Sequence, residues 1–367
     1  AGWARRIEGE IIQSDREKEH IYLHKVPIGV AVGICPWNFP FFVMARKVAA
    51  SLITGNTCVI KPSSEAPNTI MEFAELIQNI GMAPGVLNFV CGSGRLIGNA
   101  LSKSPITGII SLTGSVGAGQ QIITASAENI TKVSLELGGK APAIVCSDAN
   151  LDLAVKAIVS SKVIFSGQVC NCAERVYVQD AVYDEFVDKI TKKISEVKID
   201  DALTGTDADM SSLVSKSQID KISEMVEFAK KEGAEVLIGG KRAESFDRGY
   251  FYEPTLLTNV SQHMEIIQEE VFGPVLPIMK FNTLDEAIAL SNDCQFGLTS
   301  SVFSENFNNL MKVTNELQFG ETYINREHFE AMQGFHAGWK KSGIGGADGK
   351  HGMEEFLHTK VVYAKYF

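Results

Sequence analysis

Two apolar runs that flank one helical stretch constrain the fold more than any other feature of the sequence. The runs VPIGVAVGICP (26–36) and NTCVIKPS (56–63) have the apolar and β-branched content of buried strands. Between them, FFVMARKVAASLITG (41–55) has helical periodicity and ends in glycine. A strand, a helix and a second strand in this order form a βαβ unit, whose strands pair in parallel.

The alternation of strands and helices continues along most of the chain. We expect a helix that starts at Met71 and is stopped by Gly81 and Pro84, strands at 86–92 and 108–114, and then a second alternating run from residue 136 onward. Such alternation predicts an α/β fold with a doubly wound parallel sheet, whose ligands bind at the carboxyl ends of its strands.

Further segments of the second run and of the chain ends complete the expected organisation. In the second run we expect a helix from Leu151, a strand at 174–179 and a long helix at 181–197, while the polar segment 202–217 is typical of a surface loop. The β-branched and aromatic segments EHIYLHKV (19–26) and TKVVYAKYF (359–367) are expected to be strands of a small third unit.

Charge and cysteine content exclude several classes of partner. The formal net charge is −10 and no basic stripe is present, which argues against binding to nucleic acid. The seven cysteines are odd in number and dispersed, unlike the framework of a secreted disulfide protein. With no signal-peptide pattern at the start of the printed sequence, we expect a cytoplasmic protein.

One uncharged run is long enough to be tested as a membrane span. Residues 28–45 include 18 positions without a charge, but Pro36 and Pro40 lie inside the run. Each proline breaks a helical hydrogen bond where lipid offers no replacement. A strand followed by a turn fits better, so no membrane partner is expected.

The glycine-rich segments do not match the common phosphate-binding motifs. In GSVGAG (114–119) the residues that follow are glutamines instead of the lysine and serine or threonine of a P-loop, and GSGRLIG (92–98) misses the dinucleotide spacing by one residue. LTGSVGAG nevertheless follows an apolar strand and opens a helix. This arrangement is either a tight turn or an anion site made by helix N-terminal amides.

The clearest reactive candidates are the thiols in FSGQVCNCAERVYVQ (165–179). Neither Cys170 and Cys172 nor the strand residues His20 and His24 have further ligands at metal-site spacing, so we expect no metal. A free cysteine is often a small buried hydrophobe, whereas a thiol that attacks a carbonyl needs oxyanion donors and a base. The segment alone does not decide between these roles.

Six motifs occur in the order and at the spacings of one enzyme superfamily. They are PWNFP (36–40), KPS (61–63), TGS (113–115), LELGGKAP (135–142), GQVC (167–170) and EEVFGPV (269–275). From about residue 5 to its end the chain resembles the NAD(P)-dependent aldehyde dehydrogenase superfamily. ETYINREHFEAMQGFHAG (321–338) and KSGIGGADGKHG (341–352) resemble the members that act on lactaldehyde and glycolaldehyde.

The resemblance implies a catalytic set. Cys170 would be the nucleophile, with Cys172 a neighbour without a role. The Asn38 amide and the backbone N–H of Cys170 would stabilise the oxyanion. Glu136 would be the general base that activates water against the thioester, for which its carboxylate needs a partly apolar setting to hold a useful pKa.

The resemblance also implies contacts to a dinucleotide. Lys61 would bind the adenosine ribose, while Glu270 would hold the nicotinamide ribose with Phe272 against the ring. The implied cofactor-binding residues are Trp37, Lys61, Ser64, Gly114, Ser115, Gly139, Glu270 and Phe272.

Position 64 departs from the family pattern. NAD-preferring members carry glutamate three residues after the lysine, where it repels a 2′-phosphate. This chain has Ser64 there and Glu65 one position later, so NAD is expected with NADP as the alternative.

For substrate, the resemblance places polar side chains at Arg46, Glu330 and His336, which suits small 2-hydroxyaldehydes. Oxidation would pass through a thiohemiacetal and a thioester on Cys170 to a carboxylic acid. Two alternatives are a CoA-acylating semialdehyde dehydrogenase, whose members generally lack the base at Glu136, and a non-catalytic relative. The family's chains extend further at the N-terminus, so this one is a fragment or exposes apolar surface for something else to cover.

The same comparison sets the expected domains. Residues 1–27 would be linker and oligomerisation strands, 28–139 an NAD(P)-binding domain and 140–334 a catalytic domain. Residues 335–353 would return to the cofactor domain, and 354–367 would add an oligomerisation strand. A homo-oligomer, dimer or tetramer, is expected.

Overall fold

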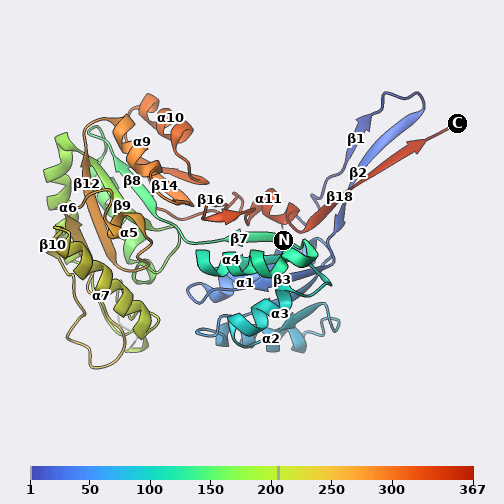
Figure 1. Cartoon of the computed structure of the whole chain (residues 1–367), viewed down its shortest axis with the longest axis horizontal. Helices are drawn as coiled ribbons and strands as arrows, with labels where there is room; N and C mark the ends of the chain where they lie inside the picture. Colours follow the sequence, from blue (N-terminus) through green and yellow to red (C-terminus); the bar gives the residue numbers. More distant parts are fainter. Residues whose placement is uncertain (1, 205–206) are drawn as a thin grey trace. The chain divides into compact units, whose positions relative to one another are not determined.

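The computed structural model describes residues 2–204 and 207–367 (Figure 1). The chain divides into two compact units. Unit 1 consists of the chain up to Leu137 together with Glu330–Ala337 and Gly343–Phe367. Unit 2 consists of Gly138–Phe329 and Gly338–Ser342.

Unit 1 is built on a six-stranded sheet in the order β17-β7-β6-β3-β4-β5. The strands are β3 (Val30–Ile34), β4 (Thr57–Lys61), β5 (Leu87–Phe89), β6 (Thr107–Thr113), β7 (Lys132–Glu136) and β17 (Gly343–Ile344). All neighbours pair in parallel except β17, which is antiparallel to β7. The predicted βαβ unit is therefore confirmed as β3, α1 and β4, and the uncharged run at 28–45 is strand, turn and helix.

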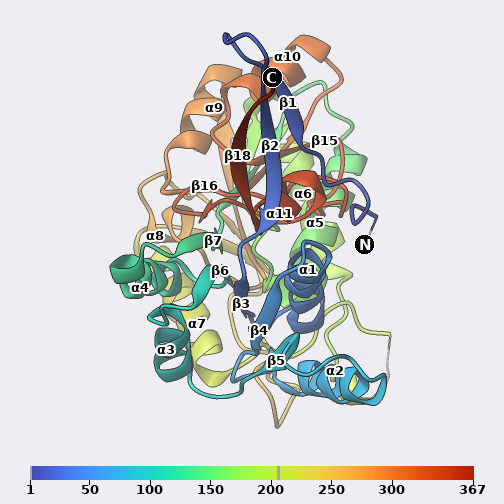
Figure 2. The ribbon, with the colours of Figure 1, turned by 90° about the vertical axis from the view of Figure 1, so that its right-hand side faces the viewer.

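Helices cover both faces of this sheet (Figure 2). They are α1 (Pro40–Ile53), α2 (Asn68–Asn79), the π-helix η1 (Gly94–Gly98), α3 (Asn99–Ser102), α4 (Val116–Ser126), the 3₁₀ helix η2 (Ala127–Asn129) and α11 (Gly349–Glu354). Ile110 and Leu135 pack with Ile122 of α4 on one side, while Ile60 packs with Met44 of α1 on the other. Burial on both faces explains why the strands are apolar without alternation.

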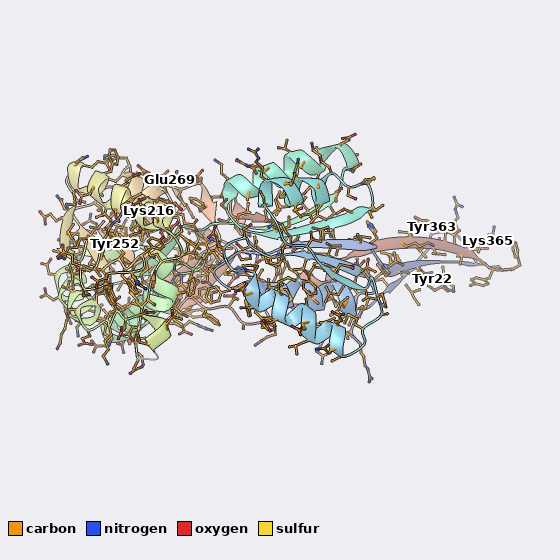
Figure 3. All side chains as sticks on the ribbon, turned by 90° about the horizontal axis from the view of Figure 1, so that it is seen from below. Tyr22, Lys216, Tyr252, Glu269, Tyr363 and Lys365 are labelled. Atoms are coloured by element: carbon orange, nitrogen blue, oxygen red, sulfur yellow. The ribbon has the colours of Figure 1, made fainter. Side chains whose placement is uncertain are left out.

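The strands expected at the two chain ends are present and pair with each other. β1 (Glu10–Gln13), β2 (Glu19–Pro27) and β18 (Leu357–Lys365) form an antiparallel sheet in the order β1-β2-β18. Tyr22, Tyr363 and Lys365 lie on this sheet (Figure 3). Some of its apolar side chains are exposed, among them Tyr363 and Ile11.

Unit 2 contains a seven-stranded sheet in the order β10-β11-β12-β9-β8-β14-β15. Only β10 is antiparallel to its neighbour. The strands are β8 (Ala141–Val145), β9 (Ala173–Gln179), β10 (Glu235–Ile238), β11 (Thr255–Thr258), β12 (Val275–Phe281), β14 (Thr299–Phe303) and β15 (Glu321–Ile324), with a separate pair β13 (Phe296–Gly297) and β16 (Trp339–Lys340).

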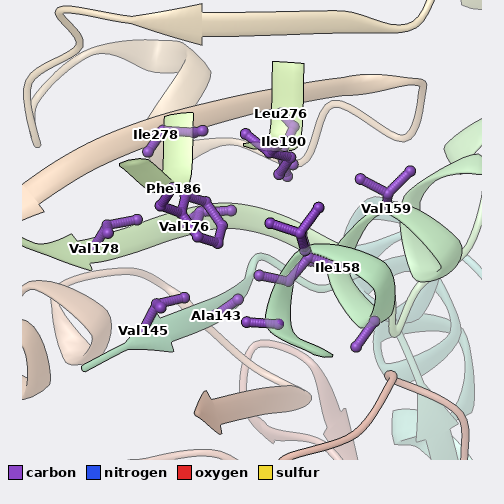
Figure 4. Close-up of a cluster of buried hydrophobic side chains, with 14 of the residues drawn as sticks. Ala143, Val145, Ile158, Val159, Val176, Val178, Phe186, Ile190, Leu276 and Ile278 are labelled. Carbon is purple, nitrogen blue, oxygen red and sulfur yellow. The ribbon is translucent and has the colours of Figure 1, made fainter. Parts of the chain in front are cut away.

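The helices of unit 2 bury both faces of its sheet. They are α5 (Leu151–Val163), α6 (Tyr183–Ser195), α7 (Lys216–Lys231), α8 (Glu265–Gln268), α9 (Leu284–Asn292) and α10 (Phe307–Glu316), with 3₁₀ helices η3 (Ile164–Gly167), η4 (Asp180–Val182) and η5 (Ala202–Thr204). In the main core, Val176 and Ile278 of the sheet pack against Ile158 of α5 and Phe186 of α6 (Figure 4).

The structure bears on two further expectations, the loop at 202–217 and the uncharged run tested as a membrane span. Helix α7 begins at Lys216 with Ser215 as its N-cap, inside the segment 202–217 that we expected to be a loop. Residues 205–206 of that segment lie outside the described residues. In the part of the chain that the structure describes, no helix is long and apolar enough to cross a membrane.

Candidate functional site

The turn between β6 and α4 of unit 1 contains Gly114 and Ser115. Gly114 N–H donates to the Glu136 carbonyl (3.0 Å), and Ser115 caps α4 by accepting the Ala118 N–H at 3.3 Å. A strand followed by a helix was expected here and is present. The N-terminal amides of this 11-residue helix attract anions, so the turn suits a pyrophosphate.

A cleft of about 780 Å³ lies beside this turn. Its lining combines apolar Ile34 and Leu112, near the carboxyl ends of β3 and β6, with Gln121 of α4. Arg95 and Lys103 also line the cleft. Arg95 belongs to GSGRLIG (92–98), the segment that does not match the dinucleotide-binding spacing. Apolar side chains, the N-terminal amides of α4 and two basic side chains together suit the binding of an adenine dinucleotide.

Lys61 and Ser64 follow β4 at the same edge of the sheet. Lys61 is buried and its amine donates to the Pro62 carbonyl at 2.7 Å, while burial lowers the pKa of that amine. Ser64 is exposed and its hydroxyl donates to the Gly92 carbonyl at 3.2 Å. Position 64 therefore carries a small, uncharged side chain that is exposed to solvent.

Trp37 and Asn38 lie in the turn between β3 and α1. Both are half-buried. The turn starts where Cys35 N–H donates to the Lys61 carbonyl (3.0 Å), and α1 begins with Pro40 at its first position. Proline is favoured there because its missing N–H has no helical partner to lose.

Glu136, the last residue of β7, lies in a charged surrounding. Its Oε2 accepts hydrogen bonds from Arg46 Nη1 and Thr113 Oγ1, both at 3.3 Å. Lys47 donates to Thr113 Oγ1 at 3.0 Å. Burial alone would raise the pKa of Glu136, but Lys47, Arg46 and then His336 outweigh it and lower the pKa. A partly apolar setting was expected for the Glu136 carboxylate. Instead, the two basic residues of α1, Arg46 and Lys47, lie next to it.

Arg46 joins three carboxylates. Besides Glu136, its Nη2 contacts Glu330 Oε1 at 3.0 Å and Asp348 Oδ2 at 2.6 Å. His336 is buried, and its backbone pairs with Ala347, next to Asp348. The structure therefore brings Arg46, Glu330, His336 and Glu136 together. Sequence reasoning missed Asp348 and Lys47, although the segment that contains Asp348 had been singled out as a whole.

In unit 2, Cys170 lies between η3 and β9 and is partly exposed. A left-handed turn precedes it, with φ of 48° at Phe165, 55° at Ser166 and 72° at Gly167. A Cβ on Gly167 would lie 2.3 Å from the Gly273 carbonyl oxygen. Only glycine allows this close approach, which sets the loop of Cys170 against the segment that contains Glu270.

Cys172 has the opposite environment. Its side chain is buried, with Sγ 3.6 Å from Lys162 Nζ. Burial raises the pKa of the thiol to about 12, although Lys162 opposes this shift. A protonated and inaccessible sulfur is a poor nucleophile, so the partly exposed Cys170 is the better candidate.

Glu270, Gly139 and Phe272 lie near the Cys170 loop within unit 2. Glu270 Oε1 accepts the Gly139 N–H at 2.7 Å, and a Cβ on Gly139 would lie 2.5 Å from the Cys170 carbonyl oxygen. Burial, with help from the Glu174 charge, raises the pKa of Glu270 to about 7 against the opposing Gly139 N–H. Phe272 has φ 56°, and its carbonyl accepts a bond from Gln218 at 2.8 Å.

Glu174 connects these segments and was missed by sequence reasoning. Its carboxylate accepts bonds from Lys162 (2.7 Å), Lys140 (2.9 Å) and the Val271 N–H (3.0 Å). The side chains of Glu174, Lys162 and Lys140 are buried. Burial opposes ionisation of Glu174, but the two lysines lower its pKa to about 2. The network ties the start of β9 to the segments that carry Gly139 and Glu270.

Glu174→Gln is expected to destabilise the protein by about 3–5 kcal/mol, because it leaves two buried ammonium groups without a carboxylate. Urea unfolding at pH 7 measures this loss. Glu227→Gln, which breaks an exposed pair with Lys230, is the matched control and should change stability by less than about 0.5 kcal/mol. A loss below about 1 kcal/mol for Glu174→Gln would contradict the role of this network.

The candidate residues divide between the two units as follows. Unit 2 holds Cys170, Gly139, Glu270 and Phe272; unit 1 holds Trp37, Asn38, Arg46, Lys61, Ser64, Gly114, Ser115, Glu136, Glu330 and His336.

Comparison with known proteins gives consistent matches over the whole chain. The sequence model described as Aldehyde dehydrogenase family matches residues 1–362. Lactaldehyde dehydrogenase of Escherichia coli (strain K12) is 56% identical over 363 residues, which are 99% of this chain and 75% of that protein. A crystal structure of lactaldehyde dehydrogenase from Escherichia coli has TM-score 0.98 at 55% identity and covers 100% of this chain and 76% of that one. A structure of 3,6-anhydro-L-galactose dehydrogenase in complex with NAP has TM-score 0.94 at 45% identity, covering 99% and 76%.

Proposed function

Because the chain belongs to the aldehyde dehydrogenase family, we propose that it oxidises small 2-hydroxyaldehydes, such as lactaldehyde and glycolaldehyde, to carboxylic acids. Enzymes of this family oxidise aldehydes with NAD or NADP. The observation that carries the substrate class is the partly buried Arg46–Glu330 pair, whose polar groups suit a hydroxylated substrate. The likeness to lactaldehyde dehydrogenase supports the same class.

In the proposed reaction, Cys170 acts first. Its thiol would lose a proton to solvent water as the sulfur bonds to the aldehyde carbon and the carbonyl π pair moves onto oxygen, and the Asn38 amide and the Cys170 N–H would donate hydrogen bonds to that oxyanion. The partial exposure of Cys170 and the burial of Cys172 support this assignment.

The cofactor supplies the hydride acceptor, and loss of hydride from the substrate carbon leaves a thioester on Cys170. Lys61 would contact the adenosine ribose, and Gly114 and Ser115 the pyrophosphate at the start of α4. In unit 2, Glu270 would hold the nicotinamide ribose beside Phe272. Trp37, Ser64 and Gly139 complete the proposed set.

Glu136 acts in the second half of the reaction. Its carboxylate takes a proton from water as the water oxygen bonds to the thioester carbon. The carbon–sulfur bond then breaks, the electron pair stays on the Cys170 sulfur, and the carboxylic acid leaves.

The direct test compares aldehydes with and without the hydroxyl. Purified protein is mixed with glycolaldehyde, lactaldehyde or propanal and with NAD or NADP, and the absorbance of reduced nicotinamide is followed. We expect kcat/KM for the hydroxylated aldehydes to exceed that for propanal by at least about tenfold. Equal values would contradict the substrate class, and acyl-CoA formed on adding CoA would favour the CoA-acylating alternative. A protein that reduces neither cofactor would be the non-catalytic relative.

Ser64→Glu is expected to lower kcat/KM with NADP by about tenfold or more while leaving that with NAD nearly unchanged, because a carboxylate there repels the 2′-phosphate. Steady-state kinetics with both cofactors measure the ratio. Glu65→Gln is the control, and it shows whether the neighbouring carboxylate already discriminates. An unchanged NADP/NAD ratio in Ser64→Glu would contradict this role of position 64.

The domain roles, assembly and location belong to the same proposal. Residues 28–139 with 335–353 would bind the cofactor, and 140–334 would carry the nucleophile. The strands within 1–27 and 354–367 would join copies into a dimer or tetramer, which their exposed apolar side chains support. Among the described residues, the cysteines form no disulfide bonds, which suits a cytoplasmic location.

A further inference from the structure

Arg46 divides its guanidinium unevenly among three carboxylates of unit 1. Nη2 contacts Asp348 at 2.6 Å and Glu330 at 3.0 Å, whereas Nη1 is 3.3 Å from Glu136. We propose that Asp348 is a positioning residue for hydrolysis of the thioester: it holds Arg46 away from full pairing with Glu136, so that Glu136 remains a competent base. This inference rests on the proposed function.

The hydrogen bonds of Glu136 agree with this role. One oxygen, Oε2, accepts the bonds from Arg46 and Thr113. Among the described residues, the other oxygen, Oε1, has no hydrogen-bond partner although it is buried. A buried carboxylate oxygen without a partner is costly for the fold and is where a base would receive a proton from water. If the Arg46 guanidinium paired with both oxygens, Oε1 would no longer be available to accept a proton from water.

The charges of the cluster explain why a third carboxylate matters. Arg46 and Lys47 bring two positive charges next to Glu136, and both lower its pKa. Asp348 and Glu330 supply negative charges that compete for Arg46. Without Asp348, more of the Arg46 charge acts on Glu136, which makes it a weaker base.

Asp348 is maintained against two unfavourable conditions. Its backbone has φ 69° and ψ 163°, a region that is accessible essentially only to glycine. Burial also raises the pKa of its carboxyl to about 6, with Arg46 opposing and Glu136 adding to the shift. The two backbone hydrogen bonds between Ala347 and His336 (2.8 and 2.9 Å) hold the residue that precedes it in place. A charged residue kept under such strain indicates function more than stability.

The arrangement also sets the pH dependence. Asp348 faces Arg46 from α1, Glu136 from β7, and His336 and Glu330 from the segment 330–337. Glu136 faces Lys47 and Arg46 of α1, Thr113 of β6 and His336. As the pH falls through about 6, Asp348 becomes protonated and Arg46 is released toward Glu136. The hydrolysis rate should then fall, as it does when Asp348 is replaced.

Two substitutions test the proposal. Asp348→Asn removes the charge at constant size, and Asp348→Gly also relieves the backbone. After rapid mixing with saturating glycolaldehyde and NAD, both should form one reduced cofactor per active site at the wild-type rate and then turn over about tenfold more slowly. The inflection of the hydrolysis rate near pH 6 should be present in the wild type and absent in Asp348→Asn.

Thermal stability separates this role from a structural one. Because the folded-state pKa of Asp348 is raised, ionisation of this group disfavours the fold above about pH 6. At pH 8 both variants should therefore unfold at or above the wild-type temperature, and the difference should shrink as the pH falls from 6 to 4. Glu8→Gln, which removes an exposed carboxylate that pairs with Lys350 of α11, should change neither kinetics nor stability.

Three results would overturn the proposal. They are burst and steady-state rates that fall by the same factor, an inflection near pH 6 that persists in Asp348→Asn, and a lower unfolding temperature of both variants at pH 8. Failure of the proposed function has a different signature, because the wild type would then reduce neither cofactor with any aldehyde. In that case the catalytic role of Asp348 is overturned. The pH dependence of the unfolding temperature would still measure the cost of burying the Asp348 carboxylate.

Discussion

Cys170→Ala is expected to lower aldehyde turnover by at least about 10⁴-fold, because it removes the sulfur that forms the thioester in the proposed reaction. Cys170 is the partly exposed thiol at the end of the left-handed turn, and Gly167 positions its loop against Gly273. The measurement is the rate of NAD reduction with glycolaldehyde over many turnovers. No burst of reduced cofactor should accompany mixing, since hydride transfer requires the sulfur adduct.

Cys172→Ala is the matched control and should retain most of the activity. Its thiol is buried beside Lys162 and remains protonated at neutral pH. Removing a small buried group costs about 1 kcal/mol of stability, which unfolding in urea measures. Equal losses of activity in the two variants would refute the assignment of Cys170.

Glu136→Gln has the second-largest expected effect, a fall of about 10²- to 10⁴-fold in the steady-state rate. The amide has no basic oxygen for water, so thioester hydrolysis stalls. In the proposed reaction, formation of the thioester does not use Glu136, so a single burst of about one reduced cofactor per Cys170 should survive. Rapid-mixing absorbance resolves the burst from the slow phase.

The comparison variant for this experiment is Glu128→Gln, which removes an exposed carboxylate of the same unit. It should behave as the wild type in both phases. If Glu136→Gln kept the wild-type steady-state rate, Glu136 would not be the base. If the burst itself disappeared, Glu136 would act before hydride transfer instead of after it.

Local patterns predicted the framework of both units. The apolar strands at 30–34 and 57–61 were readable because both faces are buried, and the helix between them starts at a proline and ends before a glycine. The helix from Leu151 was also predicted at its observed start, where Asn150 is the N-cap. The start of α7 was missed because Ser215 lies at the end of a polar segment that resembles a loop.

The environments of the site residues were not predictable in the same way. Motif order indicated Cys170 over Cys172, but the burial that distinguishes the two thiols depends on their surroundings in the fold. Glu174 contacts a backbone N–H 97 positions away, and Arg46 meets Asp348 302 positions away. No local pattern encodes such pairs, which is why the charged setting of Glu136 differed from the apolar one expected.

The order in which unit 1 is assembled follows from its interrupted chain. Strand β2 pairs with β18, and β7 pairs with β17, yet all of unit 2 is encoded between these partners. During synthesis the emerging chain can complete unit 2 while β2 and β7 still present unpaired edges. Glu330 and Asp348 reach Arg46 only after that, so the charged cluster around Glu136 is among the last features of unit 1 to form.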